Sequence, residues 1–598
     1  MFPSTHSFHI PVMGLAFTID SPVKVARFGI SSVVSITEDR LVETMRKHYY
    51  TVIGEPFKPI STKDPDYRAK RVTDYLNLLN RMVNAQIETL KSSAFRSGSD
   101  LVKYFEMLPN ESKLRQLYTR MTETRDESEK ESLQIFLRSQ VKPGSIDVNI
   151  MTKLDKPAYD QDGNEIAENS DALSAFRGYA MSNLTNSSII FSAGMNPKLF
   201  NYVEKFPVFE PTGWGQFKKH VIIKVSDYRS ALIQGKILAK KGIWVSEFRI
   251  ESGLNCGGHA FATDGFLMGP ILQEFKDKRQ ALLSELHDMY NRASEEKKRP
   301  LFDRPHPQRI TVQGGIGTVE EDRFLRSYYE LDATGWGTPF LLCPEATTVD
   351  EATLRLLQKA TEDDIVLSKN SPLGVRFHYL KGSSADLEKE RRVKSGRPGS
   401  PCTEKHLVNN TEFTTEPICT ASKKYQTLKV EQLKSMQLPP EELERKLKDV
   451  YAKDCLCVGL SNSASLVYNV PFVRKLTSVT ICPGPNIVNF SKIVTLRQMV
   501  DHIYGRLNIM TNKMRPHVFI NELHIYVTYF REQLEEQVTD AKQTAYNVKF
   551  GKNLLDGISY YRTIEHSIRN SSFGEALRAA EAEVTNLMQR LAPVPAIA

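Results

Sequence analysis

The sequence predicts an α/β fold, a (β/α)8 TIM barrel, and three observations support this. Eight short apolar, β-branched runs alternate with helical stretches, which is the pattern of parallel βαβ units. Several of these runs are followed directly by Gly or Ser, where a barrel strand would pass into its βα loop. Glycine clusters close the last two runs. We expect the strands at residues 11–17, 31–36, 145–151, 188–193, 220–225, 243–250, 309–316 and 333–342.

The chain of 598 residues is longer than one barrel needs, and two regions stand outside it. Between the second and third strands, apolar residues recur at helical spacing, which predicts a large helical insertion. They are Val72, Leu76, Leu79, Val83 and Leu90. After a basic, Gly- and Pro-containing connection at 389–401, a Cys-containing and largely helical C-terminal region begins. We therefore expect the barrel at 1–50 and 140–388, the insertion at 51–139 and the C-terminal region at 389–598.

A tail helix is expected near the end of this C-terminal region. Its apolar face would be formed by Leu577, Ala580, Val584, Leu587 and Leu591. Ser572, with Glu575 three residues later, is the expected N-cap. Such a helix would pack within the chain or form a contact in a homo-oligomer.

Composition excludes several classes of protein. The net charge of +8 comes from 79 basic and 71 acidic residues spread along the chain, which favours a solvated surface over a nucleic-acid interface. The first residues lack the features of a secretory signal, and no apolar run reaches the about 20 residues that cross a bilayer. The seven cysteines are few and odd in number, which predicts reduced thiols. We expect a cytoplasmic protein with no nucleic-acid or membrane partner.

The strongest local signal follows the sixth predicted strand, where the sequence reads Glu251-Ser-Gly-Leu-Asn-Cys-Gly-Gly-His259. Gly257 and Gly258 would let the backbone approach a flat or anionic ligand closely. His259, at the carboxyl end of a barrel strand, would point into the barrel mouth. A lone histidine is usually structural, but this placement favours a functional role.

Two more glycine clusters belong to the last two strands. Gln313-Gly-Gly-Ile-Gly-Thr318 closes the seventh, and Thr334-Gly-Trp-Gly-Thr-Pro339 lies within the eighth. In (β/α)8 enzymes the loops after these strands commonly hold a phosphate through backbone N–H groups and a helix N-terminus. One cluster alone could be a tight turn. Two clusters on this pair of strands predict a phosphate site.

These residues resemble three consecutive signatures of the nitronate monooxygenase (2-nitropropane dioxygenase-like) family and of the related FMN-dependent enoyl-ACP reductases. The signatures are Gly257-Gly258-His259, Gly314-Gly315-Ile316 and Gly335-Trp-Gly-Thr338. Residues 11–14 are similar to the first strand of the family, 148–150 to a later strand, and 364–379 to the segment after its barrel. Asn255, Cys256 and Trp336 depart from the usual pattern on the substrate side and around the ring.

The resemblance implies that the chain binds FMN without a covalent bond. The implied cofactor-binding positions are Gly14, Asn149, Gly257, Gly258, Gly314, Gly315, Gly337 and Thr338. Gly315, Gly337 and Thr338 would hold the phosphate, while Asn149 and Gly258 would contact the ribityl chain or the ring. His259 would take a proton from an acidic carbon of the substrate, as suits a base with a pKa near 6.5.

The C-terminal region contains Cys402, Cys419, Cys455, Cys457 and Cys482. Four thiolates can hold zinc or an iron–sulfur cluster, and Cys455 and Cys457 form a Cys-x-Cys pair. However, the spacings match no standard metal motif, and buried inert cysteines are the alternative. The metal set that we consider is Cys402, Cys419, Cys455 and Cys457.

Together these features predict an enzyme, an FMN-dependent oxidoreductase that oxidises a small carbon acid such as a nitronate with His259 as the base. One alternative is NAD(P)H-dependent reduction of an activated alkene. The chain lacks a G-x-G-x-x-G after a strand, so NAD(P)H would dock directly on the flavin. A second alternative is a flavin and iron–sulfur enzyme similar to glutamate synthase. A third is a flavin-binding scaffold or electron-transfer partner that is not an enzyme.

Overall fold

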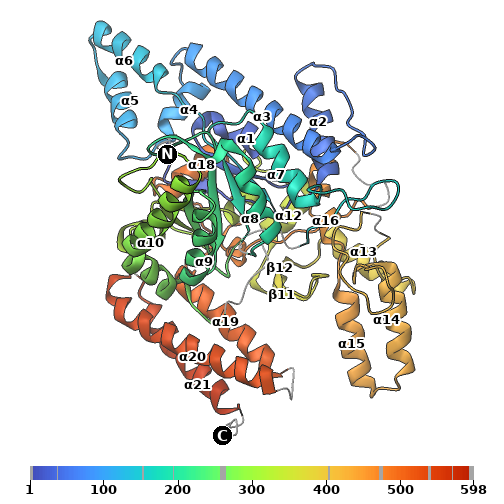
Figure 1. The fold of residues 1–598 in the computed structure, drawn as a ribbon. Coiled ribbons are helices and arrows are strands. Elements are labelled where there is room, and N and C mark those ends of the chain that lie inside the picture. Colours follow the sequence, from blue (N-terminus) through green and yellow to red (C-terminus); the bar gives the residue numbers. More distant parts are fainter. Residues whose placement is uncertain are drawn as a thin grey trace.

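A computed structural model of the chain has a closed barrel of parallel strands at its centre (Figure 1). It describes residues 5–36, 38–150, 154–192, 194–255, 264–401, 404–470, 476–535, 541–568 and 570–591. The barrel strands are β1 (Phe8–Ile10), β2 (Ser31–Ser35), β3 (Ile146–Ile150), β4 (Ser188–Phe191), β7 (His220–Val225), β8 (Val245–Glu251), β9 (Arg309–Gln313) and β10 (Ala333–Gly335). Their order is β1-β10-β9-β8-β7-β4-β3-β2, and neighbouring strands are parallel. The predicted (β/α)8 barrel is confirmed.

Helices surround the barrel and extend from it. Those interspersed with the strands are α1 (Ser21–Val25), α2 (Asp39–Val52), α7 (Asp171–Met181), α8 (Pro197–Tyr202), α9 (Tyr228–Ala239), α10 (Met268–Glu296), α11 (Val319–Tyr328) and α12 (Glu351–Lys359). The insertion after β2 contains α3 (Tyr67–Ser92), α4 (Asp100–Glu106), α5 (Lys113–Glu123) and α6 (Glu127–Ser139). Antiparallel pairs are formed by β5 (Pro211–Gly213) with β6 (Gln216–Phe217) and by β11 (Ile365–Ser368) with β12 (Phe377–Leu380).

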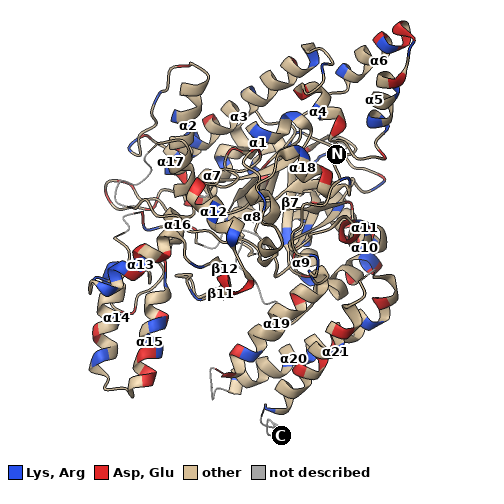
Figure 2. Ribbon diagram, turned by 180° about the vertical axis from the view of Figure 1, so that it is seen from behind, with Lys and Arg blue, Asp and Glu red and all other residues tan. Residues whose placement is uncertain are grey.

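The C-terminal region is largely helical, as predicted. Its helices are α13 (Ser384–Lys394), α14 (Lys423–Ser435), α15 (Pro440–Ala452), α16 (Leu456–Gly459), α17 (Asn462–Val467), α18 (Leu496–Ile503), α19 (Val518–Glu535), α20 (Ala541–Ile564) and α21 (Phe573–Gln589). The pair α14 and α15 extends away from the barrel, and side chains of both charges occur along it (Figures 1 and 2). In contrast, α19, α20 and α21 pack together, and α19 and α20 also contact α10.

The barrel strands alternate between apolar side chains that face the helices and polar side chains that face the interior. In β8, Phe248 packs toward α9, where Gly235 makes room for its ring. Glu247 and Arg249, on the opposite face, point into the barrel. Arg249 Nη2 lies 3.9 Å from Asp147 Oδ2 on β3. Because β3 and β8 are not neighbours in the barrel, this pair spans the interior.

Burial and charge set the protonation of this interior network. Burial would raise the pKa of Glu247, but the charges of Arg249 and Arg309 lower it to about 2. Burial raises the pKa of Asp147 to about 6, against the opposing effect of Arg249. Burial also lowers the pKa of His9 to about 3, and the charge of Arg249 acts in the same direction. His9 is therefore neutral at pH 7.

A shared hydrophobic core joins the barrel to both additional regions. The residues that predicted the insertion helix are buried in α3, and α3 packs against α2 and α7. Leu577, Ala580, Val584 and Leu587 of α21 are buried in the same cluster as the barrel residues Val34 and Val148, and Leu591 packs against it. The apolar face predicted for the tail helix is confirmed.

The first and last strands differ from their predicted bounds. β1 ends at Ile10, and residues 11–17, predicted as the strand, contain the turn that follows it. Pro11 has no N–H to donate to a ladder, and Gly14 has a φ of 58°, so this stretch does not continue the strand. β10 ends at Gly335, and residues 338–342 form the 3-10 helix η4 instead. Pro339 suits the first turn of a helix.

Two predictions for the C-terminal region hold only in part. Ser572 occupies the N-cap position of α21 as predicted, but its hydroxyl donates to Asn570 Oδ1 at 2.8 Å and makes no capping hydrogen bond to the helix. The stretch at 389–401 begins as the end of α13, so only its later part is a connection.

Within the described ranges, no helix combines the length and the apolar character that a bilayer crossing needs.

Candidate functional site

A small cavity lies where β9 and β10 end. The free space inside it is about 10 Å³, roughly that of one water molecule. The residues that line it are Asn255, Gly314, Gly315, Ile316, Gly335, Gly337, Thr338, Pro339 and Asn486. Four of them, Gly314, Gly315, Gly337 and Thr338, were predicted to bind the cofactor, and we call these four the glycine cradle. The structure therefore brings together the two glycine clusters that the sequence places about 20 residues apart.

Glycine is required on the β9 side of the cradle. Gly314 and Gly315 have φ values of 109° and 78°, which favour glycine over any residue with a side chain. A Cβ at Gly315 would lie 2.4 Å from Cδ1 of Leu254. The backbone therefore turns here with no side chain between it and the cavity, so its N–H groups can approach a ligand closely.

Three buried oxygens near the carboxyl ends of barrel strands lack a hydrogen-bond partner among the residues that the structure describes. They are Thr338 Oγ1, Asn255 Oδ1 and Asn149 Oδ1. Asn149 ends the inward face of β3, and the other two residues line the cavity. Because buried polar atoms are nearly always paired, three unpaired oxygens at one end of the barrel indicate a polar ligand. The hydrogen-bonding groups of these residues match those of a phosphate ester with hydroxyl groups.

The mouth of the barrel beside the cavity is held by Glu251, the last residue of β8. Glu251 Oε1 accepts from Asn255 Nδ2 at 2.6 Å, from Gln313 Nε2 at 2.8 Å and from Lys224 Nζ at 3.1 Å. Since Asn255 uses its amide N–H here, its Oδ1 is left for a ligand. Gln313 Oε1 in turn lies 3.3 Å from Nε2 of the neutral His9, which donates to it.

The C-terminal region closes the cavity, and the sequence analysis did not foresee this. A Cβ at Gly484 would lie 2.5 Å from Thr338 Oγ1 and 2.8 Å from the carbonyl oxygen of Leu254. Asn486 Nδ2 donates to the carbonyl oxygen of Ile316 at 3.0 Å. The segment Cys482-Pro-Gly-Pro-Asn486 is the only sequence signal available for this contact, and it indicates a turn without indicating its partner.

A buried ion pair lies directly behind the cradle. Arg515 Nη1 donates to Glu321 Oε1 at 2.5 Å, Nη2 to the carbonyl oxygen of Gly315 at 2.7 Å, and Nε to Asn486 Oδ1 at 2.8 Å. Burial would raise the pKa of Glu321, but the charge of Arg515 lowers it. The guanidinium thus fixes the β9 turn and the C-terminal segment to each other.

The N-terminus of α11 is not available to a phosphate, contrary to the prediction. Thr318 and Glu321 form a capping box, and Glu321 Oε2 accepts from the backbone N–H of Gly317 at 2.8 Å. A carboxylate therefore already occupies the positive end of this helix. The donors left to a phosphate are the backbone of the cradle and the Thr338 hydroxyl.

The remaining predicted site residues have different positions. Gly14 lies in the turn after β1, where a Cβ would be 2.7 Å from the ring of Phe17, so its contact is with the chain itself. Gly257, Gly258 and His259 fall within 256–263, outside the described residues. Their predicted roles stay predictions.

Three of the four cysteines considered as metal ligands line one larger cavity. Cys419, Cys455 and Cys457 share a hollow of about 750 Å³ with Leu456 and His406. Cys402 lies outside the described residues, and within them no three His, Cys, Asp or Glu side chains are arranged to hold a metal ion. The metal site stays a prediction, which iron and zinc analysis of the purified protein would test.

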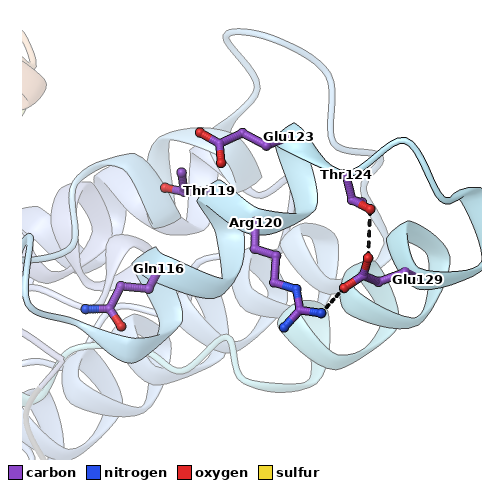
Figure 3. A pocket seen from close by; sticks show the side chains of 6 residues that line it. All are labelled: Gln116, Thr119, Arg120, Glu123, Thr124 and Glu129. Carbon is purple, nitrogen blue, oxygen red and sulfur yellow. Dashed lines mark hydrogen bonds and ion pairs between the residues drawn. The ribbon is translucent and has the colours of Figure 1, made fainter.

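A third hollow lies on the insertion, between α5 and α6 (Figure 3). Arg120 pairs with Glu129 across it, and Thr124 Oγ1 donates to Glu129 Oε2 at 2.7 Å. These polar contacts join the ends of two neighbouring helices, and they account for the hollow as part of the packing of this hairpin.

Comparisons with known proteins do not identify a family for the chain. No protein-family model matches the chain, and no curated protein is significantly similar to it. One similar solved structure is the enoyl reductase domain of MlnA from the macrolactin biosynthesis cluster of Bacillus amyloliquefaciens, with 15% identity over 71% of this chain and 88% of that one and a TM-score of 0.31. Another is nitroalkane oxidase from Streptomyces ansochromogenes, with 9% identity over 84% and 96% of the chains and a TM-score of 0.31. Likenesses this weak carry no argument about function.

Proposed function

We propose that the chain is an FMN-dependent oxidoreductase whose cofactor phosphate lies in the glycine cradle. The observation that carries this proposal is the cavity at the ends of β9 and β10, where Thr338 presents a buried hydroxyl without a partner among the described residues. In a (β/α)8 barrel this is the position at which phosphate groups are commonly held. FMN at this place would supply a two-electron acceptor.

The residues around the cavity have complementary donors and acceptors for such a ligand. The Thr338 hydroxyl would donate to a phosphate oxygen, and the cradle backbone would add N–H donors. Asn255 Oδ1 and Asn149 Oδ1 can accept from hydroxyl or ring N–H groups, which a ribityl flavin offers. Arg515, which is paired with Glu321, would hold the backbone of the cradle in place through the carbonyl oxygen of Gly315 without contacting the phosphate.

The reaction that we propose is oxidation of a small carbon acid, such as a nitronate. His259 belongs to the segment between β8 and α10, at the carboxyl ends of the strands, and would take the proton from the substrate carbon. Lys224, paired with Glu251 at the same mouth, would favour an anionic substrate.

Anaerobic mixing of the purified yellow protein with a nitronate, and separately with NAD(P)H, tests this reaction. Bleaching of the flavin by the nitronate alone supports the proposed oxidase reaction. Bleaching by NAD(P)H alone would contradict it and indicate a reductase instead. His259→Ala should keep the flavin but reduce it about 10² to 10⁴ times more slowly, as expected for loss of a general base. The exposed His566 provides the matched control, His566→Ala, which should leave the rate unchanged.

A further inference from the structure

The hollow that Cys419, Cys455 and Cys457 line is a second candidate binding site, and we call it the α14 cavity. Its volume of about 750 Å³ lies within the range of small-molecule sites, which is about 300 to 1,000 Å³. Among the described residues, none lines both this cavity and the one at the glycine cradle. A ligand in the α14 cavity would therefore bind apart from the cradle.

The walls of the α14 cavity are mainly apolar. Leu407 and Ile418 line it from the segment before α14, Leu428 from α14 itself and Leu456 from α16. Leu456 is buried, whereas the other three are only half-buried. Half-exposed apolar side chains around a hollow gain free energy when an apolar group covers them. The walls thus favour a ligand with an apolar body.

Positive charge lies beside these walls. Lys405, Lys423 and Lys424 line the cavity, all three are exposed, and none has an ion-pair partner within the described part of the chain. The described lining contains one carboxylate, that of Glu416. Lys423 and Lys424 begin α14, whose first turn contains no acidic residue. The partial positive charge of the helix N-terminus therefore adds to that of two lysines, which favours an anion at the start of α14.

A buried hydroxyl group lies at the same place. Ser400 is 6% exposed and lines the cavity, and its Oγ has no hydrogen-bond partner among the described residues. Its carbonyl oxygen accepts from the backbone N–H of Lys423 at 3.0 Å, and its N–H donates to the carbonyl oxygen of Ala421 at 2.8 Å. These bonds hold Ser400 beside the first residue of α14. Because buried polar atoms are nearly always paired, this hydroxyl indicates a ligand that accepts a hydrogen bond.

We propose that the α14 cavity binds an organic anion with an apolar chain, a medium-chain carboxylate. The carboxylate accepts from Ser400 Oγ beside Lys423 and Lys424, and the chain covers the apolar walls at Leu428 and Leu456. The proposal does not rest on the proposed function, because the cradle takes no part in it.

Isothermal titration calorimetry of the full chain with octanoate, decanoate and dodecanoate tests the apolar part of the site. Each CH2 group that enters the cavity should lower the Kd about fourfold. Decanol has the chain of decanoate without its charge and should bind about tenfold more weakly. A Kd that does not depend on chain length, or equal binding of decanol and decanoate, would overturn the proposal.

Ser400→Ala tests the polar part of the site. It should raise the Kd for decanoate about 10- to 100-fold, the factor for loss of a hydrogen bond to a charged group. The free protein should be at least as stable as the wild type, since the hydroxyl is unpaired without a ligand. Ser395→Ala is the control, because its exposed hydroxyl donates to the carbonyl oxygen of Arg392 at 2.9 Å. Equal affinity of Ser400→Ala and the control refutes the assignment.

Reversal of charge at the start of α14 gives a second variant on exposed side chains. Lys423→Glu combined with Lys424→Glu should raise the Kd for decanoate about tenfold. Lys434→Glu combined with Lys448→Glu changes the net charge equally on exposed positions outside the cavity lining and should leave the Kd unchanged. If both pairs weaken binding equally, the effect comes from net charge and the proposal fails.

Thr338→Val distinguishes this site from the cradle and from a membrane contact. The variant should bind decanoate like the wild type, and loss of binding would place the ligand in the cradle and contradict the proposal. Binding to phosphatidylglycerol vesicles without binding of free decanoate would also contradict it. If the protein binds no flavin but its affinity for decanoate depends on Ser400, the proposed function fails and the α14 site stands.

Discussion

Thr338→Val should change the stability of the flavin-free protein and its affinity for FMN in opposite directions. Thr338 is 3% exposed, and its Oγ1 has no partner among the described residues. A buried hydroxyl left unpaired costs about 1 to 3 kcal/mol, so an apolar side chain of the same branched shape should leave the free energy of unfolding equal or raise it by about 1 kcal/mol. With FMN bound, the same hydroxyl donates to a charged oxygen, a bond worth about 1.5 to 3 kcal/mol. The Kd for FMN should therefore rise by roughly 10- to 100-fold.

Two titrations measure these effects separately. Urea unfolding of flavin-free protein gives the stability, and quenching of flavin fluorescence gives the Kd. Thr347→Val is the control, because Thr347 Oγ1 donates to the carbonyl oxygen of Phe340 at 2.8 Å and is already satisfied. It should lose about 1 kcal/mol of stability and keep its FMN affinity. If Thr338→Val is destabilised like the control and binds FMN as the wild type does, the assignment of the cradle is refuted.

Three other predictions concern the elements around the site. Gly484→Ala would place a Cβ 2.5 Å from Thr338 Oγ1, so FMN should bind more weakly by about 1 to 3 kcal/mol in equilibrium dialysis. Unaltered binding would contradict the role of this segment in closing the cavity. Arg515→Met leaves the buried Glu321 unpaired and should lower the free energy of unfolding in urea by about 3 to 5 kcal/mol. Adding Glu321→Gln in the same chain should restore part of this loss. A loss below about 1 kcal/mol would argue against a buried pair. The folded-state pKa of Glu522 is raised from 4.5 to about 8, so its stabilising effect is complete below pH 4.5 and declines as the pH rises to 8. When unfolding is measured at several pH values in this window, the free energy of unfolding of the wild type should fall by up to about 1.4 kcal/mol per pH unit relative to that of Glu522→Gln. The facing Tyr561 does not contribute, because its pKa lies well above this window. A difference between the two proteins that stays constant with pH would contradict the raised pKa.

The barrel was predictable from sequence because its strands are short apolar runs bounded by turn residues. The predicted bounds of β2, β3, β4 and β7 agree with the structure to within about two residues. At β1 and β10 the apolar pattern continues past the strand: Pro11 directly follows the end of β1, and Pro339 lies in the first turn of the 3-10 helix after β10. Apolar pattern alone cannot distinguish a strand from a buried turn or a 3-10 helix.

The candidate site was predictable only as far as it is local in sequence. Gly315 and Thr338 come from glycine clusters at strand ends, and their meeting follows from the barrel topology. Gly484 and Arg515 reach the site through tertiary contacts over long sequence separations, so neither spacing nor composition identifies them. The cysteines are the most visible sequence feature of the C-terminal region, whereas its contacts with the cradle come from Gly484, Asn486 and Arg515.

The central claim is that the glycine cradle holds the single phosphate of FMN, and identification of the bound flavin tests it most directly. Protein purified gently should be yellow, and heat should release a flavin that co-migrates with FMN in chromatography at about one per chain. Thr338→Val should release less under the same conditions. Recovery of FAD, or a colourless protein that does not bind added FMN, would contradict the claim.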